Sequence, residues 1–245
     1  MSDGKEELSV TGDGIIAKPG NWSFAGDASK NFDQHVSKSV PLYMMGHDLI
    51  CDLSDYFVKT DSLVYDIGCS TGTLTYRLGE HISATNGARV IGVDREPDMI
   101  DMANKKMPKN VQNVTLLCED IASLELEKAD MIVCYYTIQF INPSIRQALI
   151  NKFYDSLNWG GALLLFEKVR GADARFQDIL SGLYLDYKLR QGYSPNDIIG
   201  KSRSLKGVLE PFSSRGNEEL FERAGFLDVN SVFKYICFEG FLGIK

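Results

Sequence analysis

Short apolar runs alternate with helical patterns over the first two thirds of the chain. Runs of Val, Ile and Leu predict buried strands, at residues 62–67, 89–94, 114–118, 129–135 and 161–168. Apolar residues that recur every three or four positions predict amphipathic helices, at residues 73–81, 97–106 and 143–157. Residues 158–161 (Asn-Trp-Gly-Gly) are expected to form the turn that ends the last of these helices. This alternation is typical of an α/β fold with a doubly wound sheet.

The region before the first strand is mostly helical. Residues 1–20 are polar and Gly-rich and are expected to form a mobile N-terminus, with residues 21–245 as a single domain. A polar helix is expected at residues 28–36 and a longer helix at residues 42–57, which Pro41 begins.

The pattern changes after the fifth strand. Residues 173–191 and 195–208 predict two helices, the first rich in aromatic residues, within an insertion at about residues 171–210. Because this insertion follows the carboxyl end of a strand, we expect it to lie over the strand ends as a lid.

The C-terminal segment predicts a helix followed by a hairpin. Residues 218–224 form the helical pattern, which Gly225 ends. Residues 229–238 and 241–244 then predict two antiparallel strands, joined tightly at Glu239–Gly240.

Composition narrows the class of protein. The chain of 245 residues, with 44% hydrophobic and 24% charged residues, has the profile of an ordinary globular domain. No apolar run approaches the roughly 18 residues that a membrane helix needs, and the acidic N-terminus does not resemble a secretory signal. The net charge of −7 argues against direct nucleic-acid binding.

Cysteine and histidine usage predicts no metal site. The five cysteines form no C-x-x-C pair, which indicates reduced thiols and a cytoplasmic protein. The three histidines, His35, His47 and His81, are widely spaced in the sequence. We therefore expect no metal as partner and, from the absence of long apolar runs, no membrane.

The most informative motif is a Gly-rich turn directly after the first strand. It contains Asp66, Gly68, Cys69, Ser70 and Gly72, in the pattern D-x-G-x-S-x-G, and a helix follows at once. Glycines in such a turn permit positive φ and the close approach of a ligand to the backbone. The pattern lacks a third glycine for phosphates, so it suits an adenosyl ligand better than a dinucleotide.

The second and third strands also end in acidic residues. Asp94 could accept hydrogen bonds from both hydroxyls of a ribose, and Asp120 could accept one from an adenine amino group. The alternative is that each acid merely caps the helix that follows it. The coincidence of both acids with the glycine turn favours the ligand role.

These features together resemble the Rossmann-like fold of class I S-adenosylmethionine (SAM) methyltransferases. More specific segments resemble the bacterial carboxy-S-adenosyl-L-methionine synthase family from about residue 20 onward, at residues 21–24 (NWSF), 39–43 (SVPLY), 66–70 (DIGCS), 136–140 (YTIQF), 160–163 (GGAL) and 192–194 (GYS). In that family the methyl group of SAM is deprotonated, with prephenate supplying both base and carbon dioxide. The product, carboxy-SAM, is then used by a partner enzyme on wobble uridines of transfer RNA.

The resemblance also implies a set of cofactor contacts and a quaternary state. The implied contacts are Tyr43, Gly68, Cys69, Ser70, Asp94, Arg95, Asp120 and Ile121. Together with the aromatic helical insertion, the resemblance makes a homodimer the expected assembly.

Two positions depart from the family pattern. Tyr135 replaces the asparagine expected at the end of the fourth strand, and Ser202 replaces the arginine that would bind the added carboxylate. Arg203 is adjacent, but one residue along a helix turns a side chain by ~100°, so Arg203 could serve instead only if the backbone shifts its register locally. Serine cannot form the bidentate pair that a guanidinium makes with a carboxylate.

These departures favour methyl transfer from SAM to a small-molecule acceptor. Tyr135, Glu167 and Arg203 are the candidate catalytic or acceptor-site residues, although Glu167 could equally cap a helix. Tyr135, Tyr136 and Tyr43 could enclose the sulfonium through cation–π contacts, or could be packing residues. Carboxy-SAM synthesis remains one alternative, and a non-catalytic SAM-fold binding protein is the other.

Overall fold

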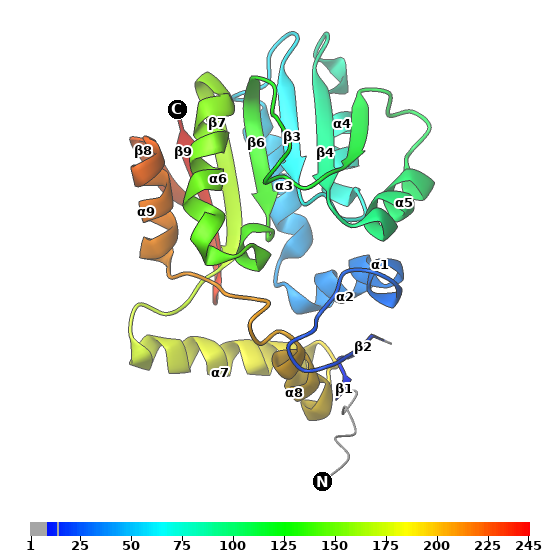
Figure 1. Cartoon of the computed structure of the whole chain (residues 1–245), viewed down its shortest axis with the longest axis vertical. Coiled ribbons are helices and arrows are strands. Elements are labelled where there is room, and N and C mark those ends of the chain that lie inside the picture. The colour runs from blue at the N-terminus through cyan, green and yellow to red at the C-terminus, as the bar shows by residue number, and fades with distance from the viewer. Residues whose placement is uncertain (1–8, 14) are drawn as a thin grey trace.

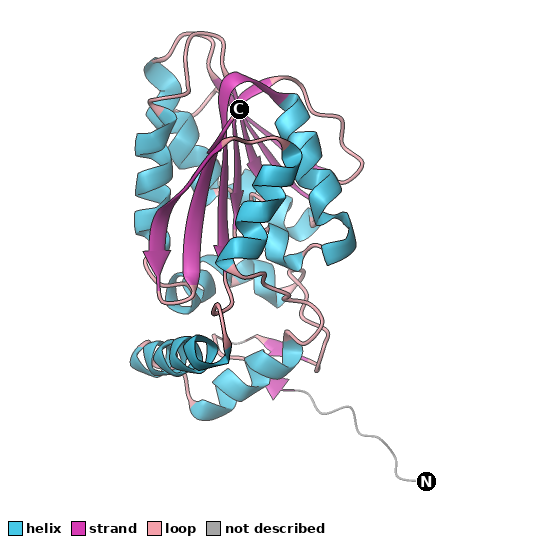
Figure 2. Cartoon of the chain, turned by 90° about the vertical axis from the view of Figure 1, so that its left-hand side faces the viewer, coloured by secondary structure: helices cyan, strands magenta, loops and turns pink. Residues whose placement is uncertain are grey.

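The computed structural model describes residues 9–13 and 15–245, which form a seven-stranded sheet with helices on both faces (Figures 1 and 2). The strand order is β5-β4-β3-β6-β7-β9-β8. The strands are β3 (Leu63–Ile67), β4 (Arg89–Asp94), β5 (Val114–Cys118), β6 (Ala129–Tyr135), β7 (Leu157–Lys168), β8 (Asp228–Tyr235) and β9 (Phe238–Ile244). The first five of these pair in parallel, whereas β9 is antiparallel to both β7 and β8. The predicted doubly wound fold with a C-terminal hairpin is confirmed.

Helices cover the sheet because alternate strand residues form two separate cores. Tyr65, Ile132 and Leu163 pack on one face with α6 and α9, and Val64 and Met131 pack on the other with α3 and α4. The helices around the sheet are α3 (Tyr43–Ser54), α4 (Thr73–His81), α5 (Pro97–Lys106), α6 (Pro143–Ser156) and α9 (Ser214–Ala224), with the short 3₁₀ turns η1 (Ile82–Ala84) and η2 (Ile138–Phe140). Together with the sheet they form the first layer of the molecule.

A second layer lies at the carboxyl ends of the strands (Figures 1 and 2). It contains β1 (Ser9–Val10), β2 (Ile16–Ala17), α1 (Asp27–Lys30), α2 (Phe32–Ser39), α7 (Ala174–Arg190) and α8 (Pro195–Ser204). The two lid helices occur where the sequence predicted them, although α8 ends four residues earlier than expected. The polar helix expected at residues 28–36 is divided between α1 and α2.

The N-terminal segment has defined structure where it is described. β1 and β2 pair antiparallel, and the chain that follows is attached to α8 because Gly20 N donates to Arg203 O at 2.9 Å and Trp22 N donates to Ser204 O at 3.1 Å. Residues 1–8 and 14 of the expected mobile N-terminus lie outside the described residues.

One helix start differs from the prediction. α3 begins at Tyr43 rather than with Pro41, because Leu42 adopts the left-handed conformation with φ of 55°. A left-handed residue cannot continue a right-handed helix, so the chain between α2 and α3 bends at this point.

Two predicted turns also lie elsewhere. The C-terminal strands are joined at Ile236 and Cys237 rather than at Glu239–Gly240. Gly240 lies inside β9, where a Cβ atom would meet the Phe166 ring at 2.5 Å, so this glycine serves packing rather than a turn. Buried Glu239 is held in the strand by hydrogen bonds from neighbouring side chains, among them Ser231 Oγ at 2.9 Å.

The segment at 158–161 is a bulge rather than a turn. Leu157 already pairs with Ala129, whereas Met131 pairs with Ala162, so the extra residues loop out within β7. Gly160 in this bulge has φ of 77°.

No helix among the described residues is long and apolar enough to cross a membrane.

Candidate functional site

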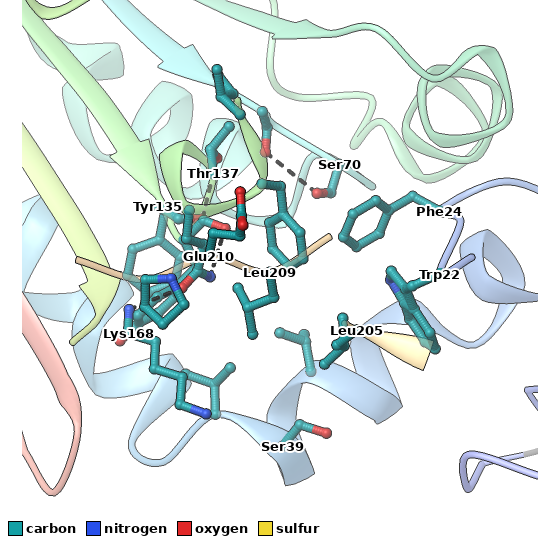
Figure 3. Close-up of a pocket in the computed structure, with 18 of the residues that line it drawn as sticks. Trp22, Phe24, Ser39, Ser70, Tyr135, Thr137, Lys168, Leu205, Leu209 and Glu210 are labelled. Atoms are coloured by element: carbon teal, nitrogen blue, oxygen red, sulfur yellow. Dashed lines mark hydrogen bonds between the residues drawn. The ribbon is translucent and has the colours of Figure 1, made fainter. Parts of the chain in front are cut away.

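A cavity of about 990 Å³ lies between the carboxyl ends of the strands and the second layer (Figure 3). Its upper wall is formed by residues that follow β3, β4, β5 and β6, and its lower wall by α2, α7 and α8. Two residues of the N-terminal segment, Thr11 and Ile15, close one side. Crevices at the carboxyl ends of strands are the usual ligand sites of open α/β sheets.

The glycine turn forms one edge of this cavity. Gly68 has φ of 76°, Ser70 of 51° and Gly72 of 79°, and the amides of Gly68 and Cys69 both donate to Val93 O. A Cβ atom on Gly68 would collide with the Thr137 side chain. The turn therefore requires glycine both for its conformation and for its close contact with β6.

Not every residue of the turn faces the cavity. Gly68 and Ser70 line it, whereas Asp66 and Cys69 line only an adjoining hollow of about 20 Å³. Asp66 is buried and accepts a hydrogen bond from Thr75 Oγ1 at 2.6 Å, and burial raises its pKa to about 7. Asp66 therefore connects β3 with α4 and does not face the main cavity.

The two acids predicted to bind the adenosyl group both line the cavity. Asp94 accepts hydrogen bonds from Ser70 N at 2.8 Å and Glu96 N at 2.9 Å, and Asp120 accepts one from Ala122 N at 2.8 Å. Burial raises the pKa of Asp94. A carboxylate has about four acceptor positions, so these backbone bonds leave each acid able to bind a ligand. Arg95 and Ile121 line the cavity beside them.

An aromatic wall continues from the glycine turn. The ring centroids of Tyr43 and Tyr135 are 5.0 Å apart, and those of Tyr135 and Tyr136 are 4.6 Å apart. Tyr135 Oη donates to Tyr43 O at 2.6 Å, which holds α3 against β6. Burial raises the pKa of all three hydroxyls, so these side chains are neutral. All three line the cavity, as an enclosure for a sulfonium requires.

Of the three candidate catalytic residues, only Tyr135 reaches the cavity. Glu167 is buried away from it and accepts a hydrogen bond from Ile138 N at 3.0 Å, so this carboxyl group caps η2. Arg203 is exposed and does not line the cavity, whereas Ser202 does. The structure therefore places neither Glu167 nor Arg203 at the cavity, although both are candidates from the sequence, because their backbone positions direct them elsewhere.

Three lysines that the sequence analysis did not single out line the cavity instead. Lys168 ends β7, Lys188 belongs to α7 and Lys201 to α8. Lys168 Nζ and Lys188 Nζ lie 4.6 and 4.7 Å from the centroid of the Tyr184 ring, and Lys201 Nζ lies over the Trp22 ring.

Burial lowers the pKa of these lysines, to about 8 for Lys188. None of the three forms an ion pair with an acidic side chain of the described residues. No sequence signal marked them, because a basic residue in a lid helix is more often on a solvated face.

The cavity thus has two chemically distinct halves. One half presents the glycine turn, two carboxylates and an aromatic wall, which fit an adenosyl sulfonium without phosphates. The other half presents the three lysines, which fit an anion. Within the described residues, no group of three or more His, Cys, Asp or Glu side chains could hold a metal ion.

Solved structures with the same architecture bind this type of cofactor. Magnesium protoporphyrin IX methyltransferase from Synechocystis, solved with bound SAH, has a TM-score of 0.63 at 15% identity, with 91% of this chain and 95% of that chain covered. Human N-acetylserotonin methyltransferase, solved with SAM, has a TM-score of 0.61 at 19% identity, with 91% and 57% covered. A family profile described as "Methyltransferase domain" matches residues 64–161. The chain has the class I SAM-dependent methyltransferase fold.

Curated relatives place the chain within this class. Carboxy-S-adenosyl-L-methionine synthase from Staphylococcus epidermidis is 34% identical over 228 residues, which cover 93% of this chain and 98% of the relative. The protein of the same name from Wolinella succinogenes is 35% identical, with 87% of this chain and 89% of the relative covered. The chain belongs to the carboxy-S-adenosyl-L-methionine synthase family. It is a SAM-dependent transferase, and SAM is its cofactor.

Proposed function

We propose that this enzyme converts SAM and a carboxylate-bearing small molecule to carboxy-SAM. The observation that carries this proposal is a group of three half-buried lysines that line the cavity without acidic partners in the described residues, Lys168, Lys188 and Lys201. Buried ammonium groups are costly unless a counter-charge compensates them. An anionic second substrate supplies that charge, and prephenate is the anion that the family resemblance implies.

The two halves of the cavity bind different reactants. Asp94 and Asp120 hold the adenosyl group, and the glycine turn lets the ligand approach the backbone at Gly68. The three tyrosines enclose the sulfonium, whose positive charge makes the methyl group acidic. The lysines hold the second substrate beside this wall, because Lys168 ends β7, the strand adjacent to β6. Holding two reactants together in this way supplies much of the rate enhancement.

Methyl transfer to a small-molecule acceptor is the second candidate. Ser202, which replaces the expected arginine, lines the cavity, and Arg203 does not take over its position. Tyr135 also replaces the expected asparagine. Methyl transfer needs no carboxylate clamp, only an acceptor in line with the S–CH₃ bond.

Incubation with SAM and prephenate, followed by mass spectrometry of the cofactor, distinguishes the two reactions. We expect a gain equal to the mass of carbon dioxide on SAM. Lys168→Met should reduce product formation about tenfold or more, since it removes one charged partner of the anion. The control Lys105→Met, at an exposed position in the last turn of α5, should retain full activity.

Two outcomes would count against carboxy-SAM synthesis. SAH without carboxy-SAM in the presence of an acceptor would favour methyl transfer. If Lys168→Met forms carboxy-SAM as fast as the wild type, the lysine group does not bind the second substrate.

We further propose that the enzyme acts in the cytoplasm as a homodimer and contacts neither membrane nor nucleic acid directly. The family resemblance and the exposed apolar residues of α7 support the dimer, and the net charge of −7 supports the absence of nucleic-acid contact.

A further inference from the structure

The side chain of Gln139 joins two strand ends at the anion-binding half of the cavity. Gln139 is buried and lies in η2, directly after β6. Its Nε2 donates to Tyr136 O at 3.1 Å, and its Oε1 accepts from Lys168 N at 3.0 Å. Both side-chain groups are therefore occupied by backbone partners, and both partner residues line the cavity.

The main chain of Gln139 holds the segment by which the chain returns from the lid. Its carbonyl oxygen accepts from Glu210 N at 3.0 Å and from Arg146 Nη2 at 3.1 Å. Leu209, Glu210 and Pro211 belong to the segment that connects α8 with α9, and all three line the cavity. Leu209 and Glu210 are labelled in Figure 3. Gln139 thus contacts three parts of the chain: the residue directly after β6, the end of β7, and residues 209–211, which we call the base of the lid.

Arg146 stabilises the contacts that Gln139 makes with these segments. Its side chain is only 2% exposed, and it donates to Ile141 O at 2.8 Å and Glu210 O at 2.7 Å besides Gln139 O. The guanidinium also lies 4.5 Å from the centroid of the Phe212 ring. A planar, multidentate donor can satisfy carbonyls from three segments at once, which a lysine cannot do.

The cofactor half of the cavity is held by other contacts. Asp94 is fixed by the amides of Ser70 and Glu96, and Asp120 by the amide of Ala122. None of these bonds involves Gln139 or Arg146. A change at Gln139 should therefore disturb the second-substrate half and spare the cofactor half.

We propose that Gln139, held by Arg146, is a positioning residue that fixes Lys168 and Tyr136 relative to the lid and thereby sets the affinity for the second substrate. The inference rests on the proposed function for the identity of that substrate. This role explains why a glutamine stands in the Y-T-I-Q-F segment at residues 136–140, because its side chain has both a hydrogen-bond donor and an acceptor.

Gln139→Leu keeps the approximate size of the side chain and removes both of its hydrogen bonds. We expect the KM for prephenate to rise about tenfold, the change associated with one lost hydrogen bond. The Kd for SAM, measured by calorimetry, should stay within about twofold. Arg146→Lys should give the same separation of the two constants. Gln139→Met also removes both hydrogen bonds with an unbranched side chain that adapts to the space, so it should give the same rise and serves if the leucine variant does not fold.

Amide hydrogen exchange gives a readout that needs no second substrate. In Gln139→Leu the amide of Lys168 should exchange about tenfold faster, because its acceptor is gone. The amide of Glu210 should also exchange faster, although its acceptor, the main-chain oxygen of residue 139, is retained. Only a shift at the base of the lid would produce this second change.

The matched control is Asn113→Leu. Asn113 Nδ2 also donates to two main-chain carbonyls, Gly79 O at 3.0 Å and Ala88 O at 3.3 Å, but it connects α4 with the chain before β4. This variant should lose stability and keep both the KM for prephenate and the exchange rate at Glu210.

Two results would overturn the inference. One is an equal loss of SAM and prephenate affinity in Gln139→Leu, and the other is unchanged exchange at both Lys168 and Glu210. If the wild-type enzyme makes no carboxy-SAM from prephenate, the proposed function fails, and exchange at Glu210 alone decides whether Gln139 positions the lid.

Discussion

Glu167 shows how much a single buried carboxylate depends on its partners. Burial raises its pKa to about 8, while Arg146 and the amides of Ile138 and Gln139 act in the opposite direction. The folded protein therefore binds a proton at this site that the unfolded chain, with its ordinary glutamate pKa of about 4.3, releases. Stability from this group is fully present below pH 4 and is lost as the pH rises toward 8.

Replacing Glu167 by glutamine should remove this pH dependence. Glutamine retains an oxygen that can accept from Ile138 N but cannot ionise. The difference in unfolding free energy between Glu167→Gln and wild type should therefore shift in favour of the variant by about 1.4 kcal/mol per pH unit between pH 5 and 8. Urea titrations at several pH values measure it, and a difference that does not change with pH would refute the assignment.

At the scale of elements, α8 decides what the lid presents to the cavity. Ser194 caps the helix, since its Oγ accepts from Asp197 N at 3.2 Å and Asp197 Oδ2 accepts from Ser194 N at 3.0 Å. This capping box fixes the start of the helix, and with it the angular position of Lys201 and Ser202 one to two turns later. A shift of one residue would bring Arg203 toward the cavity in place of Ser202.

Ser194→Ala should loosen α8 locally. Loss of an N-cap costs about 1 kcal/mol, so backbone amides of α8 should exchange about fivefold faster. Ser213→Ala, which removes the equivalent cap of α9 at Gly216 N, should speed exchange in α9 and leave α8 unchanged. Equal exchange of α8 in wild type and Ser194→Ala would show that tertiary contacts alone hold this helix.

At the scale of the whole molecule, α7 leaves much of its surface exposed. None of its residues is buried, and Phe176, Ile179 and Leu183 are 55%, 49% and 48% exposed. Their spacing of three and four residues places them on one face of the helix. An apolar helical face of this kind is typical of a protein interface, and the expected partner is a second copy of the chain.

Leu183→Glu should therefore convert a dimer into a monomer in sedimentation velocity experiments, because a charge would be buried at the interface. Leu227→Glu is the matched control, since Leu227 is 94% exposed and distant from α7 in sequence. A wild-type protein that sediments as a monomer would refute the homodimer. A variant that remains dimeric would exclude this face.

The alternation of apolar strands and helices determined the fold from the sequence alone. Most strand and helix bounds agree within a few residues, because buried parallel strands require continuous apolar runs and helices require a period near 3.6. Two of the exceptions involve glycine. Gly240 and Gly160 each indicated a turn, but one packs against Phe166 and the other lies in a bulge.

The cofactor half of the site was equally accessible from sequence. Gly68, Ser70, Asp94 and Asp120 each lie at the carboxyl end of a strand or within a few residues after it, and parallel strands end at the same edge of the sheet. Their proximity is thus a consequence of topology. The sequence could not show that Asp66 faces Thr75 instead, because the direction of a side chain in a tight turn depends on its packing.

Only the tertiary structure decided the other half. Lys168, Lys188 and Lys201 come from one strand and two lid helices that are separate in sequence, and nothing local marks which face of each helix meets the cavity. The positions of Glu167 and Arg203 outside the cavity lining and the junction at Gln139 have the same origin. Contacts between segments distant in sequence depend on how the lid is seated over the sheet, and that arrangement arises from packing rather than from periodicity.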